Sequence, residues 1–233
     1  MDKEIVNNSY RQYTITNNED ILNLLNGRCP DYALNWNELN SLHWPKGHDY
    51  YLGNKNKVHN LELREILSER LMNKKLTKNL LFCDLDGVLA DFNAGVKKRF
   101  KKFPTELNQQ VMWSIINKSL TFFEVLPWMS RGRELWNTIR HYDPIILTGI
   151  HHGNPTAAEQ KRRWCARNLG PNVKVICCYS KDKPSYCLNG SILIDDRYQI
   201  EDEWKNKGGE FILYSEEKLE DTLERIKEMY VLR

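Results

Sequence analysis

The chain has 233 residues and a formal net charge of +3, and 41% of its residues are hydrophobic and 28% charged. This composition is typical of a globular protein, and the length suits one α/β domain of ordinary size plus a smaller appendage. The small net charge gives little support for nucleic acid as a partner. No apolar run approaches the roughly 18 to 20 residues that cross a bilayer, so we expect no membrane partner.

The chain contains six cysteines at irregular spacings: Cys29, Cys83, Cys165, Cys177, Cys178 and Cys187. None forms a Cys-x-x-Cys pair, which argues against a zinc site. Several lie in apolar stretches, where a thiol acts as a small hydrophobic group. We therefore expect reduced thiols and a cytoplasmic protein, with the nucleus as the alternative.

Residues 1–78 differ in composition from the rest of the chain, being rich in Asn, Tyr and Trp without the alternation of a strand. Two helices are predicted there, Asp20–Leu25 and Leu61–Leu71. The second carries four apolar residues on one face: Leu63, Ile66, Leu67 and Leu71. We expect a mostly helical N-terminal extension that packs on the following domain. A partner-binding module is the alternative.

Five short apolar runs follow, each with the character of a strand buried on both faces of a parallel sheet. They are Leu80–Cys83, Pro144–Leu147, Val173–Cys178, Ile192–Ile194 and Phe211–Tyr214. Helical segments separate them, and this alternation predicts an α/β fold with a Rossmann-like, doubly wound parallel sheet.

Two of the intervening helices have clear boundaries. Thr156 and Glu159 have the spacing of a capping box, and the helix that they open is expected to end near Asn168, before Gly170-Pro171. The last helix is expected to begin after Ser215, with three residues buried: Leu219, Leu223 and Ile226.

Polar residues follow the first four apolar runs. They are Asp84, Asp86 and Gly87, then Thr148 and Gly149, then Lys183, then Asp195 and Asp196. Because ligands bind beyond the carboxyl ends of the strands in open parallel sheets, we expect these side chains to share one edge. The first run leads into Gly87, which would let the chain turn sharply away from its strand.

This set of side chains suits phosphoryl transfer. A carboxylate can attack phosphorus and divide one difficult displacement into two easier ones. A hard divalent cation such as Mg²⁺, held by oxygen ligands, offsets the repulsion between two anions. A second acid can protonate the leaving oxygen and then activate water, while a hydroxyl and a lysine hold the other phosphate oxygens.

Five segments resemble the motifs of the haloacid dehalogenase superfamily. They are Asp84–Phe92, Ile146–Gly149, Lys161–Trp164 with Asn168–Pro171, Ser180–Lys183 and Leu193–Arg197. The sequence Ala90-Asp91-Phe92 and the segment Leu126–Trp128 resemble the 5'(3')-deoxyribonucleotidase branch. The resemblance covers about residues 79–230. It implies a hydrolase domain over residues 79–233, with a small helical cap at about 93–131.

The resemblance also implies a catalytic and metal-binding role for four aspartates. Asp84 is the expected nucleophile and a ligand of Mg²⁺. Asp86 is the expected general acid and base, with its backbone carbonyl on the metal. Asp196 is expected to bind the metal directly, and Asp195 through water.

The substrate contacts implied by the resemblance lie on the neighbouring segments. Thr148, Gly149 and Lys183 are expected to bind phosphate, with help from Lys161. Phe92 is expected to stack near a nucleobase. The implied function is that of a Mg²⁺-dependent phosphomonoester hydrolase, acting on a nucleotide through an aspartyl-phosphate.

Several alternatives stay open. Gly149 stands where this branch usually has Ser, and Lys181 competes with Lys183 for the phosphate. The substrate could be another phosphomonoester on a nucleic-acid end, a sugar or a protein, or the chain could be a non-catalytic binding protein on the same fold. Loss of Asp84, Asp86 or Asp196 would mark that last case, and all three are present. A homodimer is also left open.

Three further groups of residues have less specific patterns. The run Lys97–Lys102 is read as a solvated helix face. Trp113, Phe122, Phe123 and Trp128 are expected to form the core of the cap, with one or two lining a base pocket. His151 and His152, directly after the second motif, are expected in a solvated loop, with contact to the substrate as the alternative.

Overall fold

The computed structural model describes residues 62, 63, 65–67, 69, 70 and 79–231. Within them the chain forms a five-stranded sheet in which every strand pair is parallel, in the order β3-β2-β1-β4-β5. The strands are β1 (Leu81–Cys83), β2 (Ile145–Gly149), β3 (Val175–Cys178), β4 (Ile192–Asp195) and β5 (Glu210–Leu213). All five coincide with the predicted runs, so the expected α/β class and parallel sheet are confirmed.

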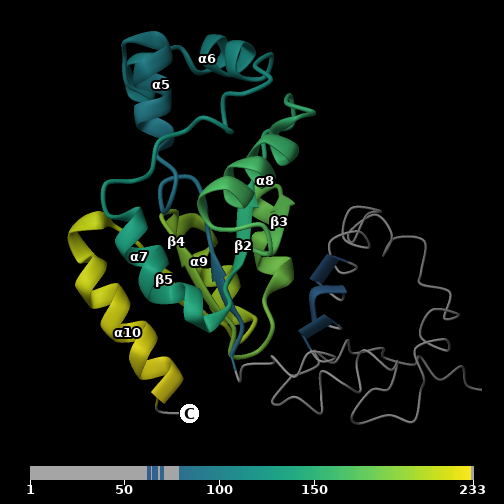
Figure 1. Cartoon of the computed structure of the whole chain (residues 1–233), viewed down its shortest axis with the longest axis vertical. Helices are drawn as coiled ribbons and strands as arrows, with labels where there is room; N and C mark the ends of the chain where they lie inside the picture. The colour runs from purple at the N-terminus through teal and green to yellow at the C-terminus, as the bar shows by residue number, and fades with distance from the viewer. Residues whose placement is uncertain (1–61, 64, 68, 71–78, 232–233) are drawn as a thin grey trace, which may run out of the picture.

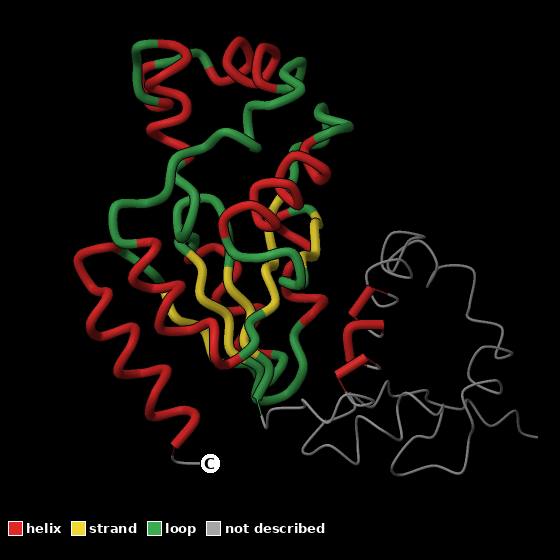
Figure 2. Tube along the Cα trace, viewed as in Figure 1, coloured by secondary structure: helices red, strands yellow, loops and turns green. Residues whose placement is uncertain are grey.

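Helices connect the strands, as Figures 1 and 2 show. The α-helices are α5 (Phe92–Phe100), α6 (Gln109–Ile116), α7 (Gly132–Ile139), α8 (Ala157–Asn168), α9 (Glu201–Asn206) and α10 (Leu219–Val231). Short 3-10 helices are η1 (Pro104–Glu106), η2 (Arg140–Tyr142), η3 (Ser180–Tyr186), η4 (Tyr198–Ile200) and η5 (Glu216–Lys218). Helices α5 and α6 stand apart from the sheet at the top of Figure 1, where the predicted cap lies.

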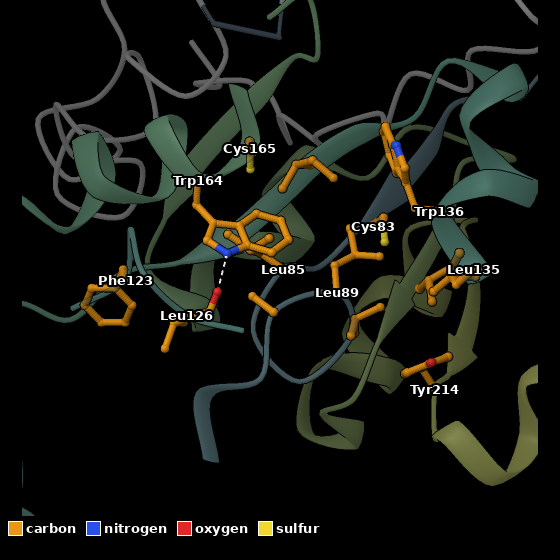
Figure 3. Close-up of a cluster of buried hydrophobic side chains, with 14 of the residues drawn as sticks. Cys83, Leu85, Leu89, Phe123, Leu126, Leu135, Trp136, Trp164, Cys165 and Tyr214 are labelled. Atoms are coloured by element: carbon orange, nitrogen blue, oxygen red, sulfur yellow. Dashed lines mark hydrogen bonds between the residues drawn. The ribbon is translucent and has the colours of Figure 1, made fainter. Parts of the chain in front are cut away.

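One face of the sheet is covered by α7, α8 and α10. Leu81 and Cys83 of β1 point into this core, together with Leu135 of α7 and Trp164 of α8. The indole Nε1–H of Trp164 donates a hydrogen bond of 2.8 Å to the carbonyl of Leu126, in the segment that returns from the cap (Figure 3). Trp164 is fully buried, so this bond connects the predicted cap to the core beside the sheet at a site shielded from water.

The opposite face is covered by α9 and by helical residues between 62 and 70. Phe82 of β1 packs edge-on against Trp204 of α9, with ring centroids 5.5 Å apart. Leu63, Ile66 and Leu67 belong to the same buried cluster. Because buried residues on both faces contact helices, the doubly wound arrangement is confirmed.

The described part of the N-terminal region therefore packs on the sheet, as the apolar pattern of Leu61–Leu71 predicts. The buried guanidinium of Arg70 lies 3.2 Å from the carboxylate of Asp143, and Lys174 pairs with Glu69. The helix Asp20–Leu25, residue Leu71 and the other residues of the predicted extension lie outside the described residues. The domain boundary near residue 78 stays a prediction.

The start of α8 corrects one detail of the sequence analysis. Thr156 precedes the helix and Asn168 ends it, as predicted, but the capping box is absent. The hydroxyl of Thr156 instead accepts from Gln160 and donates to Asn154. Gln160 is fully buried and also accepts from the backbone N–H of Phe123, so its amide connects α8 to the cap.

Two sequence expectations about the environment can be compared with the described residues. The five cysteines among them are free thiols, of which four are buried. Within the described part of the chain, the helices are too short or too polar to cross a membrane.

The packing of the N-terminal residues predicts a loss of stability for Leu67→Ala. Leu67 is 2% exposed, and removal of a buried leucine side chain costs roughly 2–5 kcal/mol of unfolding free energy. Urea denaturation followed by circular dichroism measures the change. Glu65→Ala is the matched control, because Glu65 is an exposed residue of the same helical stretch. Equal stability of the two variants would show that these residues do not belong to the folding unit of the sheet.

Candidate active site

The site begins where β1 ends. Asp84 follows the strand, and its backbone N–H donates a 2.8 Å hydrogen bond to the carbonyl of Ile194 in β4. Gly87 then turns the chain with a φ of 83°. A Cβ atom at this position would lie 2.3 Å from Oδ2 of Asp196. Glycine is thus required both by the backbone conformation and by the close approach of the Asp196 carboxylate.

Three carboxylates gather beside this turn. Ligand atoms of Asp84, Asp195 and Asp196 lie within 4.8 Å of one another. Partial burial and the charges of Asp84 and Asp195 raise the pKa of Asp196 to about 7. The raised pKa reflects the unfavourable free energy of placing several negative charges close together where little water reaches them. A divalent cation would remove that cost, because it would bind the charged form of each carboxylate.

The donor set fits Mg²⁺. The three residues offer only carboxylate oxygens, which are the ligands that hard cations prefer. Asp195 is the most engaged of them, because Oδ2 accepts from Lys183 at 2.6 Å and Oδ1 accepts from the backbone N–H of Arg197 at 2.9 Å. Asp84 and Asp196 are consequently the carboxylates best placed to bind a metal directly, and Asp195 has a second task in holding Lys183.

Lys183 is buried in the middle of this acidic cluster. Its ammonium lies 2.9 Å from Oδ1 of Asp84 and 2.6 Å from Oδ2 of Asp195, while its side chain is 1% exposed. Burial by itself lowers the pKa of Lys183, but the two carboxylates outweigh burial and raise it. Lys181 is exposed. Of the two candidate lysines, the structure therefore places Lys183 in the site.

Lys161 occupies a second buried position, on α8. Its three N–H groups match three acceptors: Oδ2 of Asp86 at 2.6 Å, Oγ1 of Thr148 at 3.0 Å and the carbonyl of Gly149 at 2.5 Å. The side chain is 1% exposed, so this lysine is not the surface residue that helical lysines usually are. In this state Lys161 orients Asp86 and Thr148, and a phosphate would have to displace one acceptor to bind it.

These contacts leave two groups available for a substrate. Thr148 accepts a hydrogen bond from Lys161, so its own hydroxyl hydrogen is free to be donated. Oδ1 of Asp86 is buried without a hydrogen-bond partner among the described residues. Burial raises the pKa of Asp86, and Lys161 partly opposes this shift. A raised pKa favours the protonated form, which a general acid needs.

A cavity of about 530 Å³ connects these polar groups to the cap. It is lined by polar groups that include Asp84, Asp86 and Lys161, and by the aromatic rings of Phe92, Trp113 and Phe123. Phe92 stacks on Trp113 with ring centroids 5.6 Å apart and on Phe123 at 6.4 Å. Phe92 is thus both part of the aromatic core of the cap and part of the cavity wall.

His151 also lines the cavity, in agreement with the alternative that it could contact the substrate and not with the preferred solvated loop. Its ring stacks on Trp113 at 4.3 Å, with an interplanar angle of 6°. Its Nδ1 accepts from the backbone N–H of Gly153 and lies 3.1 Å from Nδ2 of Asn117. Because Nδ1 is an acceptor, the neutral ring carries its proton on Nε2. Among the described residues, His152 stacks instead on Tyr179.

The fold and the acidic site together define an α/β enzyme scaffold with a candidate metal centre at the carboxyl ends of its strands, which agrees with the haloacid dehalogenase resemblance. The chain is 28% identical over 151 residues to a protein of Vibrio phage KVP40 named "Putative 5'(3')-deoxyribonucleotidase". The match covers 60% of this chain and 75% of the phage protein. No protein-family model matches the chain. The predicted resemblance is confirmed as a distant similarity to that nucleotidase.

The acidic cluster predicts that Mg²⁺ stabilises the folded protein. An ion that binds only the native state adds about 2.7 kcal/mol to the unfolding free energy at a hundredfold excess over its dissociation constant. Thermal denaturation with increasing MgCl₂ measures this as a rising Tm. Asp196→Asn should remove most of the rise, whereas Asp202→Asn should keep it, since Asp202 is an exposed residue of α9. The same rise in both variants would place the metal elsewhere.

Proposed function

We propose that the protein is a Mg²⁺-dependent phosphomonoester hydrolase with a nucleoside monophosphate as substrate, resembling a 5'(3')-deoxyribonucleotidase. The observation that carries the proposal is the composition of the cavity. Its wall combines the carboxylate of Asp84, the acid Asp86 with its unpaired oxygen and the buried Lys161 with the aromatic rings of the cap. A phosphate and a nucleobase require these two environments.

Binding of the phosphate is assigned to residues at the strand ends. The hydroxyl hydrogen of Thr148 and the third N–H of Lys183 would serve as donors for phosphate oxygens, and Gly149, next to Thr148 in the chain, lines the cavity. Mg²⁺ held by Asp84, Asp196 and the backbone carbonyl of Asp86 would neutralise part of the negative charge on phosphate and nucleophile. Asp195 holds Lys183 in place and would assist in holding the metal.

In the first chemical step, a carboxylate oxygen of Asp84 forms a bond to phosphorus, and the bond from phosphorus to the ester oxygen breaks. Asp86 gives its proton to that oxygen, which leaves as an alcohol. Lys161 supports the transfer, because its 2.6 Å contact with Oδ2 leaves Oδ1 of Asp86 free to face the substrate. The product of this step is an aspartyl-phosphate at Asp84.

In the second step, Asp86 takes a proton from water as the water oxygen bonds to phosphorus. The bond between phosphorus and Asp84 breaks, and orthophosphate is released. Asp86 ends the cycle protonated, as it began. Burial raises the pKa of Asp86, which favours the protonated form that the first step needs.

The aromatic rings of the cavity wall favour a nucleotide over a sugar phosphate as the substrate. Stacking of a base on an aromatic side chain contributes roughly 1–3 kcal/mol, by analogy with single-strand binding sites. Trp113 stacks with both His151 and Phe92, and Phe123 is 2% exposed, so the partly exposed Phe92 is the ring that a base would contact. A polymer or protein phosphatase would be better served by a shallow, basic site. A purely binding role would not require Asp84, Asp86 and Lys161 to meet in one cavity.

The mechanism predicts different results for two conservative variants. Asp84→Asn should lose turnover, because an amide is a far poorer nucleophile than a carboxylate. Asp86→Asn should keep Mg²⁺ binding, since its backbone carbonyl is unchanged, while kcat falls by roughly a hundredfold to ten-thousandfold. Phosphate release from a deoxynucleoside monophosphate measures both. Turnover that survives in purified Asp84→Asn would refute the assigned nucleophile.

The base-stacking role predicts a substrate-dependent effect of Phe92→Ala. Loss of stacking should lower kcat/KM for a deoxynucleoside monophosphate by about tenfold to a hundredfold. Hydrolysis of a sugar phosphate, which has no base, should change little. Phe103→Ala is the matched control, because Phe103 is an exposed aromatic residue of the cap outside the cavity. Equal losses on both substrates would mean that Phe92 only supports the fold of the cap.

A further inference from the structure

Gly149 and Ser180 are in unusually close contact at the ends of two neighbouring strands. A Cβ atom built at Gly149 would lie 2.2 Å from Oγ of Ser180 and 3.4 Å from its Cβ. Such a contact is too short for any side chain at residue 149 while Ser180 stays in place. The hydroxyl of Ser180 therefore occupies the space into which a side chain of residue 149 would point.

Ser180 lies close to residues to which the proposed function assigns phosphate binding. Gly149 pairs with Cys178 across β2 and β3, and Ser180 begins η3, the element that carries Lys183. Ser180 lines the same cavity as Asp84 and Lys161. Its hydroxyl has no hydrogen-bond partner among the described residues. By contrast, Ser185 of the same element donates to the carbonyl of Asp182 at 2.7 Å.

We propose that the Ser180 hydroxyl binds the substrate phosphate by donating a hydrogen bond to one of its oxygens. The proposal rests on the proposed function and adds a phosphate ligand to it. Thr148 and Ser180 then present two hydroxyl donors from the ends of adjacent strands. A glycine at residue 149 is then required, because a side chain there would occupy the position of the Ser180 hydroxyl.

The arrangement also gives Gly149 a fixed place. Its carbonyl accepts from Lys161, and the residue pairs with Cys178 of β3, whereas β1 pairs with β2 only as far as Ile146. The end of β2 is thus held by β3 and by Lys161, next to the loop that supplies the Ser180 hydroxyl. A donor held in this way stabilises charge on phosphate without reorganising during the reaction.

The first experiment compares Ser180→Ala with Ser185→Ala. Loss of one hydrogen bond to a charged phosphate should lower kcat/KM of Ser180→Ala by roughly tenfold to a hundredfold. The inhibition constant for orthophosphate should rise in parallel, which is a readout of binding without turnover. Ser185→Ala should retain wild-type values for both. Wild-type values in Ser180→Ala would overturn the proposal.

A reciprocal exchange tests the same idea if Ser180→Ala folds poorly. Gly149→Ser alone should lose activity, because its side chain would collide with Ser180. Gly149→Ser combined with Ser180→Gly should recover orthophosphate inhibition and most of the activity, since the hydroxyl returns to nearly the same place from the other strand. A double variant that folds, by circular dichroism, but is no better than Ser180→Gly alone would overturn the proposal.

These results are separable from failure of the proposed function. Activity of Asp84→Asn would remove the nucleophile and the hydrolase mechanism, whatever Ser180 does. Loss of activity in Asp84→Asn together with wild-type behaviour of Ser180→Ala would leave the hydrolase mechanism in place and reject the Ser180 phosphate contact alone.

Discussion

The structure of the site depends on balancing four carboxylates, those of Asp84, Asp86, Asp195 and Asp196, with two buried ammonium groups. Lys183 pairs with Asp84 and Asp195, and Lys161 pairs with Asp86. Each lysine is 1% exposed, and a buried charge without its partner costs several kcal/mol. Helix α8 supplies Lys161 and η3 supplies Lys183. The pairing of the buried charges therefore depends on where these two elements lie relative to the strand ends.

The same elements connect the reacting groups to the cap. Helix α8 carries Lys161, and on the same helix Gln160 and Trp164 bind backbone groups of Phe123 and Leu126. Phe123 in turn lines the cavity, and its ring centroid lies 4.9 Å from the Lys161 ammonium. Helix α8 therefore supports both the cap and the residue that orients Asp86, and in the proposed hydrolase it would support substrate recognition and proton transfer together.

The departures from the sequence analysis have physical reasons. Thr156 and Glu159 have the spacing of a capping box, but the buried amide of Gln160 needs acceptors and takes the Thr156 hydroxyl. Gly149 looks like a lost polar residue in the sequence, yet the hydroxyl of Ser180, 31 positions further along the chain, takes up the space beside it. In each case, the side chain that decides the outcome is a neighbour in the folded structure, and the motif read from the sequence does not include it.

The amino-acid sequence by itself determined the strand order along the chain, the parallel α/β class and the residues at the strand ends, because buried strands are apolar throughout and polar residues mark their termini. Asp84, Asp86, Thr148 and Asp196 could be chosen on that basis. Only the tertiary structure decided that Lys183 and not Lys181 enters the site, that Lys161 is buried, and that His151 joins the cavity wall. The end of a buried strand can be recognised in the sequence, but no comparable pattern shows which way a side chain on a helix or loop points. The positions of Lys183, Lys161 and His151 therefore follow from packing between segments distant in sequence.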